Sequence, residues 1–323
     1  MNSFSASTTK LGFIGLGGMG SRIAARLLAA GYDVSVFDRN PAKRDALKAK
    51  GARAAESLAE LAGSVHVVLS CLTNDQSVRD VYFGGDGVLE NIRPETTVIE
   101  MSTILPATSR ELASKGVQAG VQVLDVAISG STPAAEQGTV TLLAGGNPDV
   151  FQASLPIFQA IAAKYFHLGP SGAGTTMKMV VNAILGVEMQ AIAEAAALGE
   201  KAGLSREILL QVLAQTAVIA PAHVGKLARA ARGEYAPQFP LALMNKDFRL
   251  ILRLADEVGA MMPTTAAAFQ VSTETLATHG DSDFSAVVER MKHLSTKKAS
   301  GQSAGRNEGT TNRDRRRNSY LSE

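Results

Sequence analysis

The first half of the chain alternates short apolar runs with segments whose apolar residues recur at helical spacing. The apolar runs have the length of single strands, and several end in glycine or a polar residue. Strands that alternate with helices in this way predict a mostly parallel sheet covered on both faces. Strands are expected at 11–15, 33–38, 66–70, 97–101, 122–128 and 139–144, and helices at 18–30, from Pro41 onward, and at 77–83.

The pattern changes at about residue 169, after which helical spacing dominates and no segment has a convincing strand pattern. The second half therefore predicts an all-helical region that follows the sheet. Its first helix is the longest and is rich in Ala, Met and Val. Helices are expected at 172–202, 205–214, 222–231, 241–258, 263–278 and 283–291.

Residues 295–323 differ from both halves because they hold only four apolar side chains. Such a segment cannot bury enough surface to offset the entropy of ordering it, so we expect a disordered tail. It contains seven Lys or Arg and three acids, a net +4, which leaves −2 for residues 1–294 out of a total of +2. The predicted pI of about 8.6 thus reflects the tail. A mildly acidic body argues against a nucleic-acid-binding domain.

The remaining composition limits the class of protein. A single cysteine, Cys71, excludes an intramolecular disulfide framework and favours a reducing compartment such as the cytoplasm. No run of about 18 apolar residues predicts a membrane span, and residues 1–10 lack the pattern of a signal peptide. The five histidines show no metal-ligand spacing, so no metal is expected.

The strongest motif is the G-x-G-x-x-G pattern at residues 15–20, which follows one predicted strand and opens the first predicted helix. Gly15 permits a tight turn, Gly17 lets the backbone approach a pyrophosphate, and Gly20 lets helix and strand pack closely. The start of the helix then offers N–H groups and a positive dipole end to the phosphates. The motif predicts a Rossmann-like, doubly wound sheet that binds NAD(H) or NADP(H).

Two signals for the choice of cofactor conflict. Asp38 lies 18 residues after Gly20, at the end of the second predicted strand, where an acid accepts the ribose hydroxyls of NAD. Arg39 follows directly and, with Lys43, could pair with the 2′-phosphate of NADP. The sequence leaves NAD and NADP about equally supported. The expected organisation is a flexible N-terminus at 1–9, an NAD(P)-binding domain at 10–169, a helical substrate and dimerisation domain at 170–294, and the basic tail at 295–323.

Four later segments, together with the glycine motif, resemble the β-hydroxyacid dehydrogenase family over about residues 10–292. The segments are Glu100-Met-Ser-Thr103, Asp125-Val-Ala-Ile-Ser-Gly-Ser131, Gly172-Ala-Gly-Thr-Thr-Met-Lys-Met-Val-Val-Asn182 and Phe239-Pro-Leu-Ala-Leu-Met-Asn-Lys-Asp247. The Ser-Gly-Ser triplet, the Phe-Pro-Leu segment and Asp283-Phe-Ser-Ala-Val-Val look closest to the glyoxylate/succinic semialdehyde reductase branch. Many family members have a second glycine where this chain has Ser131.

The resemblance makes Lys178 the catalytic residue and Asn182 its partner. The two are four positions apart, so both side chains share one face of the long helix. Hydride addition to a carbonyl leaves an alkoxide, and a positioned ammonium can supply the proton that it needs. In the oxidation direction the neutral amine would accept that proton, while Asn182 can bond the substrate or fix the lysine.

The resemblance also implies two further groups of site residues. The substrate carboxylate would be held at the loop after the 122–128 strand, and the reductase branch adds two residues near the fourth helix of the helical region. The substrate group is Ser129, Gly130, Ser131, Phe239 and Asp247. The cofactor group is Gly15, Leu16, Gly17, Gly18, Met19, Gly20, Asp38, Arg39, Lys43, Leu72, Thr73, Ser77, Thr103 and Lys246.

We therefore expect an NAD(P)-dependent oxidoreductase that interconverts a small carboxylate-bearing aldehyde and its hydroxy acid. It should form a homodimer or homotetramer through its Ala- and Met-rich helical region, and no membrane or nucleic-acid partner is expected. An imine reductase is an alternative, although related imine reductases usually lack the lysine. A non-catalytic nucleotide-binding or chromatin-associated scaffold is a second alternative, against which Lys178 and the acidic body argue.

Overall fold

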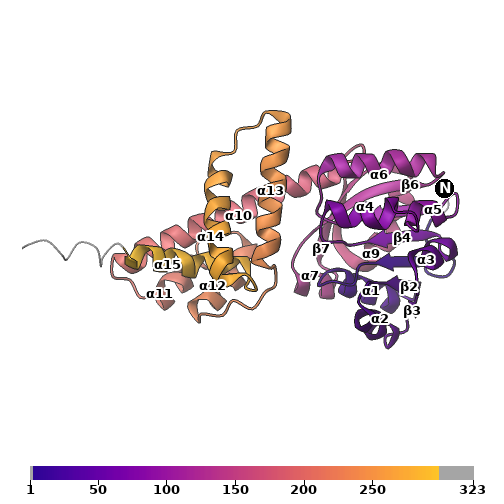
Figure 1. The fold of residues 1–323 in the computed structure, drawn as a ribbon. Helices are drawn as coiled ribbons and strands as arrows, with labels where there is room; N and C mark the ends of the chain where they lie inside the picture. The colour runs from indigo at the N-terminus through magenta and orange to yellow at the C-terminus, as the bar shows by residue number, and fades with distance from the viewer. Residues whose placement is uncertain (1–2, 298–323) are drawn as a thin grey trace, which may run out of the picture.

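The computed structural model of the chain describes residues 3–297 and shows a sheet region and a helical region joined by one long helix (Figure 1). The expected tail lies outside the described residues except for 295–297, which form the end of the last helix rather than a disordered segment. The expected flexible N-terminus is also not what residues 3–9 show. Phe4 packs against the core of the sheet region, and its N–H donates to the Ala153 carbonyl at 3.0 Å.

The sheet region contains eight strands in the order β3-β2-β1-β4-β5-β6-β7-β8 within the described residues. Neighbouring strands are parallel except β6 and β7, so the expected α/β fold with a mostly parallel sheet is confirmed. The strands are β1 (Lys10–Ile14), β2 (Asp33–Phe37), β3 (Arg53–Ala54), β4 (Val67–Ser70), β5 (Thr97–Glu100), β6 (Gln122–Ser129), β7 (Val140–Gly145) and β8 (Ala162–His167).

Helices cover both faces of this sheet, and each face has its own apolar core. One core packs Ile23 and Leu27 of the first helix and Phe158 against the sheet, and the other packs Leu61 and Tyr82 against the opposite face. The helices are α1 (Gly20–Ala29), α2 (Pro41–Lys48), α3 (Leu58–Ser64), α4 (Asp75–Phe83), α5 (Val88–Asn91), α6 (Pro106–Gln118), α7 (Thr132–Gln137), α8 (Pro148–Ala153) and α9 (Leu155–Ile161).

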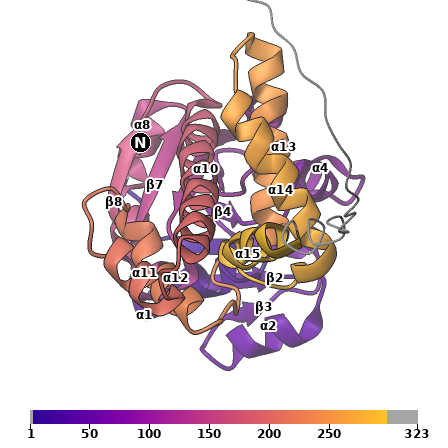
Figure 2. The same cartoon turned by 90° about the vertical axis from the view of Figure 1, so that its left-hand side faces the viewer.

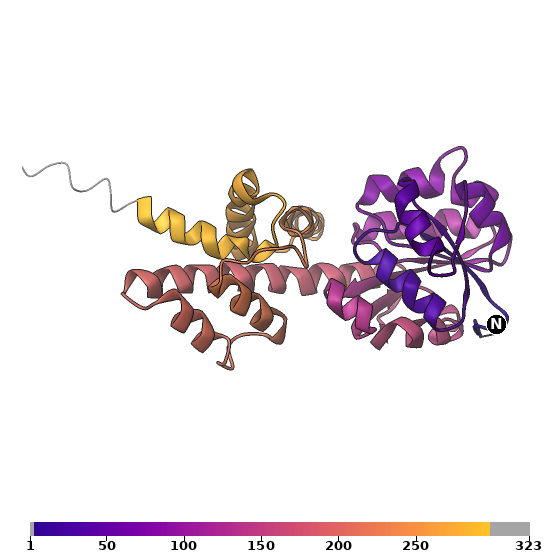
Figure 3. The same cartoon turned by 90° about the horizontal axis from the view of Figure 1, so that it is seen from below.

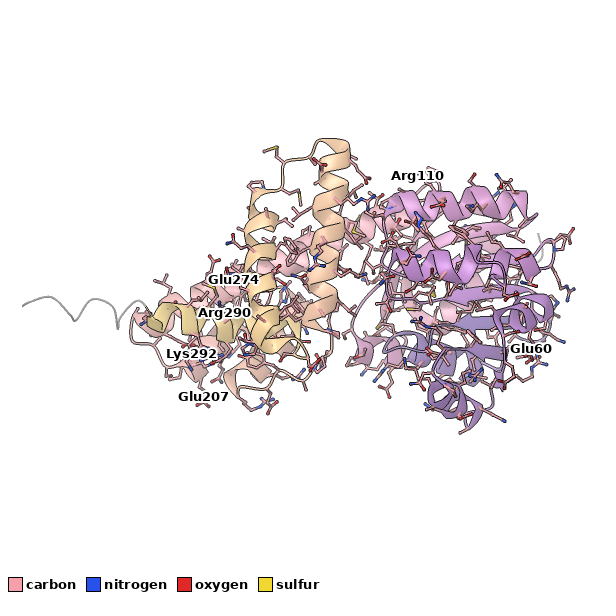
Figure 4. All side chains as sticks on the ribbon, in the orientation of Figure 1. Glu60, Arg110, Glu207, Glu274, Arg290 and Lys292 are labelled. Atoms are coloured by element: carbon pink, nitrogen blue, oxygen red, sulfur yellow. The ribbon has the colours of Figure 1, made fainter. Side chains whose placement is uncertain are left out.

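The helical region is built around the long helix. Helices α11 and α12 lie on one side of it, and α13, α14 and α15 lie on the other (Figures 2 and 3). An ion pair of 3.2 Å between Glu274 and Arg290 joins α14 to α15 (Figure 4). The elements are α10 (Ala173–Lys201), α11 (Arg206–Leu213), α12 (Pro221–Ala231), α13 (Leu241–Val258), α14 (Pro263–His279), the 3₁₀ helix η1 (Phe284–Ala286) and α15 (Val287–Lys297).

The long helix α10 passes the length and composition test for a membrane span, which the sequence pattern had not indicated. Its most apolar window has a mean hydropathy of 1.3, and 50% of that window is buried. Its first turns pack against β6 and β7, and its later turns pack against α13, α14 and α15. The core of the protein thus accounts for much of its apolar composition.

The elements absent from the sequence prediction are the short and irregular ones. Strand β3 has two residues, and β8 is an edge strand whose burial does not alternate in a simple apolar pattern. Helices α3, α5, α7, α8 and α9 are short, whereas α6 is a longer helix that the sequence pattern did not predict. The predicted helix at 283–291 is divided into η1 and α15, because Asp283 caps a 3₁₀ turn through the Ser285 N–H. Expected boundaries elsewhere agree within two residues.

Candidate active site

The turn between β1 and α1 has the backbone shape that the glycine motif predicts. Gly15 adopts a φ of +92°, and a Cβ there would run into the Cys71 carbonyl oxygen. A Cβ at Gly20 would run into the Gly15 carbonyl oxygen, so only glycine allows helix and strand to approach this closely. A Cβ at Gly17 would meet no atom within 4 Å. Nothing in the fold itself requires Gly17, and its open side is where a ligand can approach the backbone.

The residues around this turn fit a nucleotide. No side chain caps the N-terminus of α1, so no side chain takes up the N–H groups at its positive end. Asp38 lies at the end of β2, where its carboxylate accepts the Leu16 N–H at 2.8 Å and the Asn40 N–H at 2.9 Å. Lys43 lies 3.7 Å from the same carboxylate, and Arg39 is exposed beside it. The structure thus brings the acid and both cations to one edge of the glycine turn.

The loop after β4 lies against the glycine turn. The Leu72 side chain and the Cys71 carbonyl are the closest neighbours of Gly15, and Thr73 is exposed. Burial raises the pKa of the Cys71 thiol to about 12, so this thiol is not a reactive nucleophile. Ser77 sits in the first turn of α4, where its N–H donates to the Asn74 side chain.

Asp125 ties the sheet to the helix that carries the predicted catalytic lysine. Its buried carboxylate accepts the Gly172 N–H at 2.7 Å and the Thr175 N–H at 2.9 Å, so it caps α10 from the neighbouring strand. Burial raises the pKa of Asp125, and these N–H bonds oppose that shift. Arg110 of α6 lies beside the same helix start (Figure 4). Sequence reasoning assigned Asp125 no role, although a carboxylate inside an apolar strand is a signal that it is paired.

Lys178 is buried on α10, with a residue exposure of 7%. Burial lowers the pKa of its ammonium to about 8, while Asp247 raises it and Lys246 lowers it further. Among the described residues its ammonium has no hydrogen-bond partner. Asn182, one turn later, donates from Nδ2 to Asp247 Oδ2 at 2.6 Å, and its Oδ1 is buried without a partner. Two polar groups on one helix face are therefore free for a ligand.

Lys246 connects the two regions. Its ammonium donates to the Thr103 carbonyl after β5 at 2.6 Å and lies 3.0 Å from Asp247 Oδ1. Asp247 in turn holds Asn182, so a continuous polar chain runs from the end of the sheet to the face of α10. The structure thereby brings Thr103, Lys246, Asp247 and Asn182 together, and Lys178 lies near enough to Asp247 and Lys246 to feel both charges.

The loop after β6 approaches the glycine turn from the other side. Thr132 lies 3.4 Å from the position of a Cβ on Gly18. Gly130 has a φ of +153°. Ser131 is the N-cap residue of α7, and its hydroxyl makes no capping hydrogen bond. Ser129 ends β6 and is partly buried. Backbone N–H groups and an unspent hydroxyl at a helix start can hold an anionic group.

Phe239 packs against the core of the helical region. Its ring packs edge-on against Phe284 at 5.5 Å between centroids, and its N–H donates to Asp283 at 2.9 Å. Among the described residues, its ring contacts and hydrogen bonds lie in the helical core, and none involves Lys178 or Asn182.

Within residues 3–297 there is no group of three or more His, Cys, Asp or Glu side chains that could hold a metal ion.

Comparisons with known proteins agree with this architecture. Residues 10–169 match the model of the NAD binding domain of 6-phosphogluconate dehydrogenase. Residues 172–291 match the model described as NAD-binding of NADP-dependent 3-hydroxyisobutyrate dehydrogenase.

Individual relatives cover nearly the whole chain. Glyoxylate/succinic semialdehyde reductase 1 of Arabidopsis thaliana is 36% identical over 88% of this chain and 98% of that protein. The 3-hydroxyisobutyrate dehydrogenase of Pseudomonas aeruginosa is 35% identical over 86% of this chain and 97% of that protein. The structure of Mycobacterium tuberculosis 3-hydroxyisobutyrate dehydrogenase with L-serine has a TM-score of 0.81 and 32% identity, and the match covers 88% of this chain and 99% of that one. The chain therefore belongs to the β-hydroxyacid dehydrogenase family of NAD(P)-dependent oxidoreductases.

Proposed function

We propose that this protein reduces a small carboxylate-bearing aldehyde, of the semialdehyde or glyoxylate type, to its hydroxy acid, or catalyses the reverse reaction. The observation that carries the proposal is the buried, unpartnered ammonium of Lys178 beside the Asn182–Asp247 pair. The relatives named as semialdehyde reductase and hydroxyisobutyrate dehydrogenase support the substrate class. L-serine, named with one of the solved structures, is likewise a small acid with a hydroxyl group.

Lys178 acts as the proton donor in reduction and as the acceptor in oxidation. The bound nicotinamide supplies or takes up the hydride. Burial lowers the pKa of Lys178 to about 8, so the ammonium loses a proton more readily than an exposed lysine does. Its positive charge also stabilises the alkoxide oxygen as negative charge develops there. Asp247 offsets part of the burial penalty, which keeps the ammonium form populated near neutral pH.

Asn182 orients Lys178. Its Nδ2 is held by Asp247, so the amide cannot rotate freely, and its unpartnered Oδ1 is left to accept a hydrogen bond from the Lys178 ammonium, whose other protons then face the substrate oxygen. Ser129, Gly130 and Ser131 hold the substrate carboxylate at the opposite wall, through backbone N–H groups and the Ser131 hydroxyl. The family resemblance is the ground for including Phe239, whose ring packs in the core of the helical region, among the substrate contacts.

When the dinucleotide is bound, residues 15–20 would hold its pyrophosphate, and Asp38 would hold its adenosine ribose. Leu72, Thr73, Ser77 and Thr103 would contact its nicotinamide half, together with Lys246, which donates to the Thr103 carbonyl. Asp38 already accepts two backbone N–H bonds, yet it remains beside Arg39 and Lys43. Both NAD(H) and NADP(H) are therefore to be tested.

The active form is a homodimer or homotetramer in the cytoplasm. Apolar residues of α10 at seven-residue spacing, Met177, Ile184, Ala191 and Leu198, are exposed along one side of the helix. On the neighbouring helix α11, Ile208 and Val212 are exposed as well. Exposed apolar side chains gathered on two packed helices are typical of a subunit interface. Measurement of the mass in solution for the natural chain and for Ile184→Glu tests it, since a monomer in both would contradict the proposal.

A steady-state screen tests the reaction itself. Succinic semialdehyde, glyoxylate and the corresponding hydroxy acids are each offered with both reduced or both oxidised cofactors, and a cyclic imine serves as the competing substrate. Turnover of a carboxylate-bearing aldehyde that is faster than that of the imine supports the proposal. Turnover of the imine alone would overturn it.

A further inference from the structure

A row of buried polar residues crosses the centre of the sheet. Ser70 on β4, Glu100 on β5 and Asp125 on β6 lie directly opposite one another in register. Each has an exposure of 1% or less. Ser70 and Glu100 are the last residues of their strands, at the edge where open α/β sheets bind their ligands. Asp125 caps α10, but nothing described so far explains a buried glutamate at position 100.

The ionised carboxylate of Glu100 fixes which groups donate and which accept in its hydrogen bonds. Its carboxylate accepts the Ser102 N–H at 2.7 Å, and it also bonds the hydroxyls of Ser102 and Ser70. An ionised carboxylate only accepts, so both serines must donate to it. The Ser102 oxygen is then left to accept the Leu72 N–H, which lies 2.6 Å away. Tyr82 lies 2.6 Å from the Ser70 oxygen and completes the network on the far side.

Two of the loops around the glycine turn depend on this carboxylate. The first is the 71–73 loop, whose Leu72 N–H is fixed by Ser102 and whose Cys71 carbonyl contacts Gly15. The second is the 102–103 segment, whose Ser102 N–H donates to Glu100. The next residue, Thr103, accepts the bond from Lys246 at its carbonyl. One buried group thus connects the cofactor turn with the lysine that bridges to the helical region.

We propose that ionised Glu100 is a positioning residue, which holds the 71–73 and 102–103 loops in the shape that receives the nicotinamide dinucleotide. The inference rests on the proposed cofactor path and goes beyond it, because it assigns control of cofactor affinity to a group that does not touch the cofactor. A protonated carboxyl must instead donate to one of the serine oxygens. When that oxygen belongs to Ser102, the added donor competes with the Leu72 N–H for it and weakens their bond.

The charge state of Glu100 changes within the working range of an enzyme. Burial raises its pKa to about 7, the bonds from Ser102 and Ser70 lower it, and Asp125 raises it. The other groups that face this site are the neutral Tyr82 and Cys71, and Lys246 from α13. Cofactor affinity should therefore fall as the pH falls through about 7, because the protonated form positions the loops poorly.

The test measures the dissociation constant of the reduced cofactor by fluorescence titration between about pH 5.5 and 8.5, a window that brackets this transition. Glu100→Gln keeps the shape and removes the charge. At the high end of the range it should bind the cofactor about tenfold more weakly than the natural chain, the loss that one charge-assisted hydrogen bond can produce. Its affinity should also be independent of pH once the ligand's own titration, common to both proteins, is divided out.

Two further variants separate positioning from general damage. Ser102→Ala removes the hydroxyl that joins Glu100 to Leu72, and it should weaken binding as Glu100→Gln does, with little added effect in the double variant. Tyr82→Phe removes one buried hydroxyl from the side of the network away from the loops, and it should keep both the affinity and its pH dependence. Thermal unfolding of each variant confirms that the compared proteins are folded.

The outcomes distinguish this inference from the proposed function. If Glu100→Gln binds cofactor within about twofold of the natural chain and retains its pH dependence, the positioning role is wrong. Equal losses in Tyr82→Phe and Ser102→Ala would also overturn it, since the effect would then be general. If the natural chain binds cofactor as proposed but reduces no carbonyl acid, the proposed reaction fails while the role of Glu100 stands.

Discussion

The two regions of this protein build their parts of the site in different ways. In the sheet region, the cofactor turn is shaped by missing side chains: Gly15 and Gly20 are required by backbone atoms of the turn itself, and Gly17 leaves open space. In the helical region, the predicted catalytic face depends on buried polar partners: Asp247 holds Asn182, and Lys246 reaches to Thr103. The first arrangement is local in the sequence, and the second joins residues 65 and 143 positions apart.

The difference teaches which residues tolerate change. A backbone-built site fails when an atom is added, whereas a site built from buried charges fails when a partner is removed. Lys178 belongs wholly to the second kind, since its useful pKa comes from burial and from the balance of Asp247 against Lys246. The following experiments should therefore affect chemistry, helix placement and cofactor binding separately.

The largest effect is expected from Lys178→Ala. Removal of a positioned general acid lowers turnover by about 10²- to 10⁴-fold. The cofactor dissociation constant should stay near its natural value, because the residues proposed to hold the cofactor lie in the glycine turn and its neighbouring loops. The exposed Lys201 at the end of the same helix supplies the matched control, and Lys201→Ala should keep full activity. Near-normal turnover in Lys178→Ala would remove the lysine from the mechanism.

The pH dependence of turnover should have opposite signs in the two directions. With a Lys178 pKa of about 8, reduction needs the ammonium and should fall about tenfold per pH unit above that value. Oxidation needs the neutral amine and should rise through the same pH to a plateau. The pKa of Lys178 in the folded protein lies below the ordinary value of 10.5. Between these two values the unfolded chain binds one more proton at Lys178 than the folded protein does, so the free energy of unfolding rises with pH across that window. Identical pH profiles in both directions would contradict the assignment of Lys178.

The features that the sequence predicts are the local ones, and those that it does not predict are contacts between distant segments. Gly15 to Gly20 and the 241–258 helix are encoded by neighbouring residues, so their pattern predicts them directly. The contact of Lys246 with the Thr103 carbonyl depends on how two distant elements meet, which neither segment encodes, and only the family resemblance pointed to it. Glu100 was visible as an acid at a strand end and Asp125 as an acid within a strand, but their partners at Ser70 and Gly172 were not. Phe239 was expected at the site, yet its contacts lie in the helical core.

A smaller effect is expected at the junction of the two regions. Asp125→Ala leaves the buried N–H groups of Gly172 and Thr175 without an acceptor, which should destabilise the protein by about 1–3 kcal/mol. Asp125→Asn keeps one side-chain oxygen and should lose less. Urea unfolding measures both. Because α10 begins at this cap, turnover should fall along with stability; full activity in Asp125→Ala would show that the helix start does not position Lys178.

The smallest effect is expected at the glycine turn, where Gly17 and Gly20 should respond differently to the same substitution. Gly17→Ala places a methyl group where no protein atom lies within 4 Å, so the free energy of unfolding should change by less than about 0.5 kcal/mol. The same methyl group would separate the backbone from the pyrophosphate, and the cofactor should bind about tenfold more weakly, a loss of about 1.4 kcal/mol. Gly20→Ala instead drives a methyl group into the Gly15 carbonyl and to 3.0 Å from the Phe13 ring, so it should destabilise the fold by about 1–3 kcal/mol before any ligand is added. If Gly17→Ala bound the cofactor normally, the open side of the turn would not be where the pyrophosphate lies, although the sheet that carries the turn would be unchanged.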